Sequence, residues 1–255
     1  MKKYIIAFLL LVISFLYIFL SNETGGARVF VNLMTFAGIY GLAAIGINVH
    51  FGWTGLLNFG HAAFMGIGAY VTVLLIPHSL GREGVVISSG LPLPLAILIG
   101  IIAAALLGLL LGLPTLRLRG DYLAIVTIAA AEIFRLLVRD FEDLTGGVYG
   151  IIQFSDSLQS SRPDFITRFS DSHNISPAQF WVGLLTWISI IVVLLILSRL
   201  KKSPWGRALR AVREDEDAVR ALGKNAVLLK LQSFMLGAAI GCLLYTSDAA
   251  DEWIG

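Results

Sequence analysis

The sequence predicts an all-α protein that crosses a membrane several times as a polytopic transmembrane helix bundle. Three observations support this prediction. The 255 residues are 57% hydrophobic and only 14% charged, which is too apolar for a soluble globular domain. The apolar residues gather in seven stretches, each near the ~20 residues that a helix needs to cross a bilayer. The charges gather between these stretches, in a pattern that gives a consistent topology.

The seven predicted spans alternate across the membrane without any conflict in the loop charges. The expected spans are 4–20, 29–49, 56–76, 93–113, 121–138, 179–198 and 226 onward. Residues 199–224 carry eight Lys or Arg, and Arg117 and Arg119 lie in the 114–121 loop, whereas residues 139–177 carry three Arg against six Asp or Glu. Because Lys and Arg favour the cytoplasmic side, we expect a cytoplasmic N-terminus, a cytoplasmic loop at 199–225 and an external loop at 139–177.

The first apolar stretch, residues 4–20, follows Met1, Lys2 and Lys3. A signal peptide would begin in the same way, but this stretch is long and no small-x-small cleavage site follows it cleanly. We therefore favour a retained first transmembrane helix. Elsewhere, a single cysteine gives no disulfide framework, and no basic patch with interleaved aromatic residues suggests a nucleic-acid partner.

Residues 203–225 form the longest charged segment between two apolar stretches. Ser203 followed by Pro204 is typical of a helix start. An apolar stripe at i, i+3, i+4 and i+7 follows, made by Trp205, Ala208, Leu209 and Val212. Residues 214–217, all acidic, are expected in the first turn of a second helix, which Gly223 would end as a C-cap glycine next to Lys224. We expect two short helices joined at an angle on the membrane face.

Within this segment, Asp217-Ala218-Val219 is followed by Gly223 after three further residues. The pattern resembles the EAA-xxx-G loop of ABC-importer permeases, with Asp for the usual Glu and Val for the second Ala. In that family the loop docks into a groove on a separate ATPase subunit. The resemblance implies docking contacts from Arg213, Glu214, Asp217, Ala218 and Gly223. The alternative interpretation is an ordinary solvated cytoplasmic loop.

The third stretch is rich in small residues and carries two polar ones. Asn58 and His61 lie at or near membrane depth, where a polar side chain is by default a candidate for function. Gly60, Gly66 and Gly68 allow close backbone approach. We assign these five residues to the translocation path, although the glycines fit helix packing better than substrate contact, and His61 fits a hydrogen bond to a neighbouring helix equally well.

The fourth and fifth stretches carry features that we interpret as structural. Gly100, Ala104, Gly108 and Gly112 recur every four residues, which predicts a face for close helix packing. Glu132 and Arg135 stand at i, i+3, so that they can neutralise each other on one helix face. We favour a structural ion pair over a substrate contact.

Four separated segments, taken together, resemble the LivM-type permease of branched-chain amino acid ABC transporters. They are residues 55–70 (GLLNFGHAAFMGIGAY), Gly120-Asp121-Tyr122 with Glu132-Ile133-Phe134-Arg135, the Thr-Gly-Gly-x-x-Gly-Ile turn at 145–151, and the cytoplasmic loop. The resemblance covers most of residues 29–241. It implies an ABC-importer permease fold over residues 1–241, which would translocate Leu, Ile and Val.

The same resemblance implies the partners of the chain. Two ABC ATPase subunits would supply the energy, a LivH-type permease would complete the pore, and a periplasmic binding protein would deliver the substrate to the outer face. The chain itself would be a non-catalytic subunit of the bacterial inner membrane, in contact with membrane lipid. The sequence has no GxxxxGK[ST] motif and no His/Cys/Asp/Glu cluster with zinc spacing, so that we expect no cofactor or metal.

Other functions remain open at this stage. Within the same family, the substrate could be urea, a short amide or another amino acid. An ion-coupled secondary transporter would need titratable groups within the membrane, for which Glu132 and His61 are the candidates. A membrane enzyme would need a clustered reactive set, which the sequence lacks.

The C-terminal residues 242–255 form a segment that we expect to be non-native. The run CLLYTSDAADE breaks the last apolar stretch with acidic residues and resembles the translated product of a sequencing adapter. We therefore expect the native chain to be truncated near Gly241, where the permeases that it resembles continue with further helices, and Cys242 not to be a feature of the protein. The alternative is a genuine frayed C-terminus.

Overall fold

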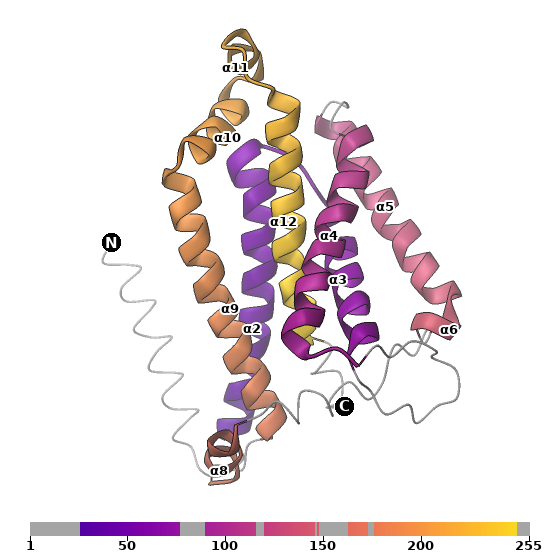
Figure 1. Cartoon of the computed structure of the whole chain (residues 1–255), viewed down its shortest axis with the longest axis vertical. Helices are drawn as coiled ribbons and strands as arrows, with labels where there is room; N and C mark the ends of the chain where they lie inside the picture. Colours follow the sequence, from indigo (N-terminus) through magenta and orange to yellow (C-terminus); the bar gives the residue numbers. More distant parts are fainter. Residues whose placement is uncertain are drawn as a thin grey trace.

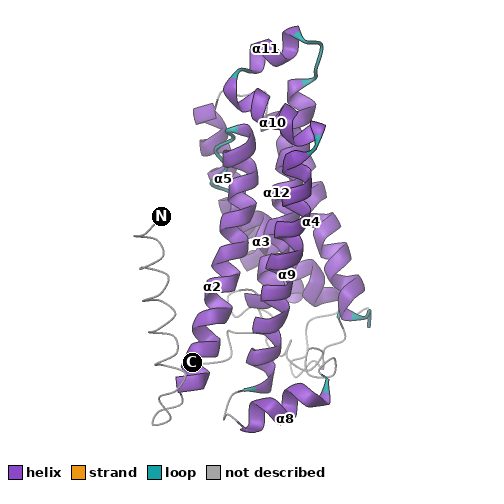
Figure 2. Cartoon of the chain, turned by 90° about the vertical axis from the view of Figure 1, so that its left-hand side faces the viewer, coloured by secondary structure: helices purple, strands orange, loops and turns teal. Residues whose placement is uncertain are grey.

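The computed structural model describes residues 26–76, 90–115, 120–145, 147, 163–172 and 176–248, and these residues form helices and loops without any strand (Figure 2). The six long helices are α2 (Gly26–Asn48), α3 (His61–Leu75), α4 (Leu93–Thr115), α5 (Gly120–Asp140), α9 (Pro177–Lys202) and α12 (Ala226–Asp248). The short ones are the π-helix η1 (Val49–Trp53), α6 (Glu142–Thr145), α8 (Asp164–Ser172), α10 (Pro204–Glu214) and α11 (Glu216–Ala221).

Four segments of the described chain are long and apolar enough to cross a membrane: Gly26–Thr54, Leu93–Thr115, Pro177–Lys202 and Ala226–Leu243. They confirm four of the seven predicted spans. The helix α3 is apolar but has 15 residues, and α5 combines its apolar residues with five charged ones. The predicted span at 4–20 and the arginines of the 114–121 loop lie outside the described residues.

The start of α3 differs from the prediction, which began this helix at residue 56. Gly55 has a positive φ of 71°, which a residue without a Cβ adopts at little cost, and it turns the chain away from η1. The amide oxygen of Asn58 then accepts a hydrogen bond from the Gly60 N–H at 2.9 Å, which closes a turn before the helix. Hydropathy does not reveal this turn between η1 and α3, because the residues around it are apolar.

The helix α12 lies at the centre of the bundle, between α2 and α4 (Figure 1). Half of its apolar window is buried, against 28–33% for the other three candidate spans. One hydrophobic cluster joins it to α2, η1, α9 and α10, and a second joins it to α3, α4 and α5. The last element of the described chain is therefore the one on which the others pack.

The small-residue face of α4 packs as predicted. Gly100, Ala104, Gly108 and Gly112 are all buried. A Cβ on Gly108 would lie 3.1 Å from the Cβ of Ala238 and 3.3 Å from the Cα of Met235, so that α4 and α12 meet nearly backbone to backbone. A glycine also allows close approach of α3 and α12, because Cys242 lies buried in α12 close to Gly68 of α3.

The loops that the charge count assigns to one side lie at one end of the bundle. The end of α4 and the start of α5 are at the end that carries α10 and α11, whereas α6 and α8 are at the opposite end (Figure 1). Residues 148–162 and 173–175 of the predicted external loop lie outside the described residues. The arrangement therefore agrees with the predicted alternation of the described loops.

Candidate functional site

The helices α10 and α11 form an elbow, defined here as residues 203–225, and its helix starts are capped by side chains. The Ser203 hydroxyl accepts a hydrogen bond from the Gly206 N–H at 3.2 Å, and Pro204 opens α10. The Asp215 carboxylate accepts one from the Ala218 N–H at 3.0 Å, which caps α11. The prediction was wrong for Glu214, which ends α10, so that Glu216 and Asp217 make the acidic first turn of α11.

The second helix of the elbow ends at a glycine in a left-handed conformation, as predicted. Gly223 has a φ of 73°, and its N–H donates to the Arg220 carbonyl at 2.9 Å. The Lys224 N–H donates to the Val219 carbonyl at 3.2 Å. These two bonds define a Schellman motif, which satisfies the last carbonyls of α11 and fixes the direction in which the chain leaves it.

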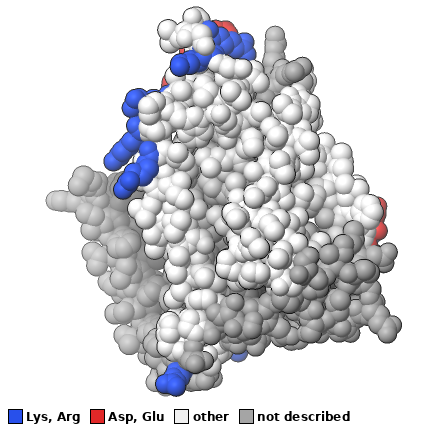
Figure 3. All heavy atoms as spheres, in the orientation of Figure 1, with Lys and Arg blue, Asp and Glu red and all other residues white. Residues whose placement is uncertain are grey.

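The tip of the elbow is exposed. The Asp217 side chain is 94% exposed, and Leu222, a large apolar residue, is 80% exposed. Ala218 and Gly223 are exposed as well, and a Cβ on Gly223 would have no atom within 4 Å. The tip therefore offers a small, partly apolar surface that a second protein could approach closely. On the face that Figure 3 shows, Lys and Arg gather around this end of the bundle, and the described surface between the two ends is almost uncharged.

The body of the elbow is firmly attached to α12. Val212, Val219 and Ala226 form a buried cluster. The Lys230 ammonium of α12 pairs with the Glu216 carboxylate of α11.

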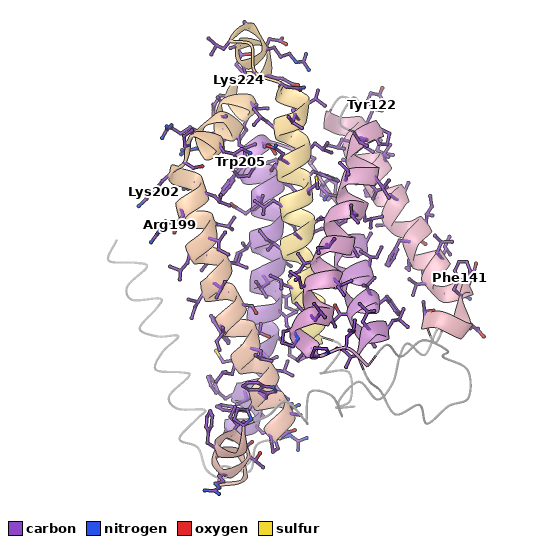
Figure 4. The ribbon with its side chains drawn as sticks, in the orientation of Figure 1. Tyr122, Phe141, Arg199, Lys202, Trp205 and Lys224 are labelled. Atoms are coloured by element: carbon purple, nitrogen blue, oxygen red, sulfur yellow. The ribbon has the colours of Figure 1, made fainter. Side chains whose placement is uncertain are left out.

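The tryptophan of α10 makes a further attachment. The Trp205 indole N–H donates to the Gln232 amide oxygen at 2.7 Å, and its ring packs edge-on against Trp53 with 6.1 Å between centroids. Trp205 points inward from α10 (Figure 4). A force on the tip would therefore be transmitted to α12 and to η1, because the elbow is joined to both by packed and hydrogen-bonded side chains.

Arg213 joins the elbow to the turn after α2. Its guanidinium donates to the Gly52 carbonyl at 2.7 Å and pairs with Glu214 at 2.5 Å. Gly52 belongs to η1, a π-helical turn, and such turns are frequent at functional sites. Arg213, one of the five residues predicted to dock the ATPase, thus contacts the transmembrane bundle.

His50, two residues before Gly52 in η1, is fully buried and connects three parts of the fold through one chain of hydrogen bonds. Because the Asn58 amide oxygen accepts from the Gly60 N–H, its nitrogen faces the His50 Nδ1 at 3.0 Å as a donor. The other ring nitrogen, Nε2, lies 2.9 Å from the Phe234 carbonyl, which can only accept. The partners therefore fix a neutral ring with its proton on Nε2, and His50 ties η1 to α12 and to the turn before α3.

His61 lies beside His50, with 5.5 Å between ring centroids in an edge-on arrangement. It is 4% exposed, and neither of its ring nitrogens has a hydrogen-bond partner among the described residues. A Cβ on Gly46 or Gly241 would lie 2.7–2.8 Å from the His61 ring, so that glycines of α2 and α12 make room for it. A buried polar group without a partner is costly, which marks His61 as a candidate for function.

The predicted path glycines contact different neighbours. A Cβ on Gly60 would overlap the Thr127 carbonyl of α5, and one on Gly66 would lie 2.5 Å from the Phe134 ring of α5. Gly68 instead faces α12. Asn58, Gly60 and His61 are thus brought together with His50, whereas Gly66 and Gly68 lie further along α3 and hold it against two other helices. The geometry at all three glycines is that of close helix packing.

The ion pair predicted on α5 is present. The Arg135 guanidinium donates to the two Glu132 carboxylate oxygens at 2.9 Å and 2.5 Å, and both side chains are more than half exposed. The pair lies in the C-terminal half of a 21-residue helix. No group of three or more potential metal ligands occurs among the residues that the structure describes.

Sequence reasoning missed His50 as a functional candidate. It lies one residue beyond the predicted end of the span at 29–49, and no role was assigned to it. A polar residue within a turn of a span end, eleven residues before a second histidine, was the available signal. Its two partners, Asn58 and Phe234, come from the segment before α3 and from α12, and only the fold brings them together.

Comparison with known proteins agrees with these features. A family model described as "Branched-chain amino acid transport system / permease component" matches residues 29–245. The chain is 37% identical to the high-affinity branched-chain amino acid transport system permease protein LivM of Salmonella typhimurium, over 87% of this chain and 52% of the relative. It is 35% identical to the LivM protein of Escherichia coli, over 98% of this chain and 58% of the relative.

The relatives include a second kind of permease protein. A LivH permease of Escherichia coli is 25% identical over 83% of this chain. The chain spans little more than half the length of the two LivM relatives, and no solved structure matches it. The matched family consists of transport permease components, which agrees with the prediction of a non-catalytic membrane subunit with several spans. The chain belongs to the family of branched-chain amino acid transport system permease components.

Proposed function

We propose that this chain is the LivM-type permease subunit of an ABC importer for Leu, Ile and Val, and that the elbow docks an ABC ATPase. The observation that carries the proposal is the elbow itself, which combines an exposed tip with a body fixed to α12 and η1. An ordinary solvated loop has no need for both helix caps, a Schellman end and four attachments to the bundle. The LivM relatives support the choice of substrate class by their names.

In this proposal, closure of two ATPase subunits moves the elbow, and the bundle follows. Arg213 passes the movement to Gly52, next to His50, and the Glu216–Lys230 pair passes it to α12. Both routes meet at Phe234, whose carbonyl lies against the His50 ring. The predicted path residues would then respond together, because the glycines hold α3 against α5 and α12, His61 lies against Gly241 of α12, and Asn58 is hydrogen-bonded to His50. These path residues are Asn58, Gly60, His61, Gly66 and Gly68.

The second permease subunit, of the LivH type, would cover the outer face of α5. Glu132 and Arg135 are exposed on this face within a predicted span, and an ion pair facing lipid is costly. A protein partner or an aqueous path removes that cost. The proposed orientation has a cytoplasmic N-terminus and elbow in a bacterial inner membrane, with residues 139–177 facing a periplasmic binding protein.

Docking is tested by Gly223→Trp, with Gly223→Asn as the matched control. Asparagine tolerates a positive φ, so that the control keeps the end of α11, whereas the indole fills the open space at the tip. We expect the tryptophan variant to lose ATPase copurification and leucine uptake, and the asparagine variant to keep both. Unchanged recruitment and uptake in the tryptophan variant would refute docking at this surface.

Substrate and energy source are tested by uptake into vesicles that contain the assembled transporter. We expect valine and isoleucine to compete with labelled leucine, and urea and acetamide not to compete. Preferential inhibition by urea or acetamide would favour the short-amide alternative within the family. Uptake that survives removal of the ATPases would favour an ion-coupled secondary transporter, for which His61 and Glu132 are the titratable candidates.

A further inference from the structure

The junction of α9 and α10 contains a basic pocket of about 450 Å³, which the proposed docking function does not use. Four cations and one hydroxyl line it: Ser198, Lys201, Lys202, Arg207 and Arg210. They come from the last turn of a membrane-spanning helix and from the helix that follows it. The pocket therefore lies where a span meets the lipid headgroups, on the outside of the bundle, where Arg199 and Lys202 also point away from the helices (Figure 4).

Among the residues that the structure describes, none of the four cations has an acidic partner. Arg207 donates to the Lys202 carbonyl at 3.1 Å, and Arg210 donates to the Lys201 carbonyl at 3.2 Å, so that both guanidinium groups cover the C-terminal end of α9. Among the described residues, the acidic groups that form ion pairs do so with other cations. The positive charge at this pocket is thus left for a ligand from outside the described chain.

An apolar groove of about 470 Å³ adjoins the basic pocket and shares Ser198 and Lys201 with it. Its other walls are Ala44, Ile45 and Asn48 of α2, Trp53, and Leu194 and Leu197 of α9. The groove thus runs from the charged end of α9 towards its apolar middle. Trp53 and Trp205 pack together beside it, at the depth that aromatic residues favour in membrane proteins.

We propose that this double site binds one anionic phospholipid. The phosphate of its headgroup lies among Lys201, Lys202, Arg207 and Arg210, and an acyl chain lies in the groove between α2 and α9. A basic pocket between membrane helices is the kind of surface that recognises anionic headgroups. An acidic segment of another protein would match the charges but not the groove, which lies along the apolar part of two spans. The bound lipid would brace α9 against α10, at the base of the elbow.

The test compares two double variants of equal charge in the full chain. Lys201→Gln with Lys202→Gln removes two exposed pocket cations whose side chains form no hydrogen bond or ion pair with the described part of the chain, so that the fold is kept. Arg199→Gln with Lys224→Gln removes two exposed cations that do not line the pocket. Each protein is placed in nanodiscs of phosphatidylcholine with 10% phosphatidylglycerol, extracted gently, and analysed by native mass spectrometry for retained phosphatidylglycerol.

We expect the unaltered chain and the control variant to retain one phosphatidylglycerol in preference to phosphatidylcholine. The pocket variant should retain at least roughly tenfold less phosphatidylglycerol. Inorganic phosphate at 10 mM should not displace the lipid. The proposal is overturned if the unaltered chain shows no preference for phosphatidylglycerol, if both double variants lose it equally, or if inorganic phosphate displaces it. It is also overturned if the pocket variant retains the lipid but loses ATPase copurification, because the cations would then serve a protein partner.

Discussion

Replacing Asn58 by Asp exchanges one hydrogen-bond donor for an acceptor at the buried junction of η1, α3 and α12. The shape of the side chain is unchanged. The oxygen that still accepts from the Gly60 N–H keeps its role, while the second oxygen takes the place of the amide nitrogen 3.0 Å from the His50 Nδ1. Two acceptors then face each other, and His50 cannot release its other nitrogen, because the Phe234 carbonyl needs the Nε2 proton.

The expected cost follows from burial. Asn58 is 7% exposed and His50 is fully buried, so that water cannot repair the lost bond. A buried polar group left without its partner costs about 1–3 kcal/mol, and a charged one costs more. For a chain of this size each kcal/mol corresponds to roughly 2–4 °C, and a cost of about 1–3 kcal/mol therefore lowers the unfolding temperature by about 2–12 °C, towards the upper end because the introduced group is charged.

The assay is thermal unfolding in detergent, with Asn225→Asp as the matched control. Asn225 is exposed in front of α12, and its side-chain oxygen accepts a hydrogen bond from the Leu228 N–H that a carboxylate keeps, so that the same exchange should stay within about 0.5 kcal/mol. The destabilisation by Asn58→Asp should shrink as the pH is lowered, because a proton on either the introduced carboxylate or the imidazole restores a donor. An unfolding temperature equal to that of the control at neutral pH would refute the assigned hydrogen-bond chain.

Three further predictions test the packing, the cap and the coupling. Gly108→Ile should lower the stability by about 1–3 kcal/mol in the same assay. In the control, Gly41→Ala, the new Cβ would meet only the end of a side chain at 3.8 Å, so that this change should be neutral or slightly stabilising. Equal effects of the two changes would argue against close helix contact at α4. Asp215→Ala should speed amide hydrogen exchange in α11 by about fivefold, because a cap contributes ~1 kcal/mol, whereas Asp215→Asn should leave the exchange rate unchanged. If Asp215→Ala also leaves the rate unchanged, the cap does not stabilise α11. Arg213→Gln should reduce leucine uptake several-fold while ATPase copurification persists, and full uptake would contradict its coupling role.

The helices and their ends were largely predictable because the signals that set them are local. Four spans follow from hydropathy alone, and the elbow follows from Ser203, Pro204 and Gly223, which act within a few residues of themselves. Where two local signals compete, sequence reasoning was less exact. Glu214 could end one helix or begin the next. Because Asp215 caps α11, Glu214 belongs to the end of α10.

The contacts that join the parts of the site were not predictable from the sequence. The Arg213 guanidinium and its acceptor at Gly52 are 161 residues apart, and His50 and the Phe234 carbonyl are 184 apart. Neither pair leaves a periodic or compositional trace. The glycines of α3 were recognisable as small residues, but their neighbours in α5 and α12 depend on how the helices pack.

Docking of the elbow on an ATPase is the central claim, and site-specific crosslinking within the assembled transporter tests it most directly. Leu222→Cys places a thiol at the exposed tip, and Phe165→Cys places one at the opposite end of the bundle, where the native side chain is 67% exposed. With a short bifunctional reagent and a reactive residue on the ATPase, we expect the first variant to form a crosslinked species and the second to form none. A crosslink from Phe165→Cys alone, or none from Leu222→Cys in a transporter that still imports leucine, would contradict the claim.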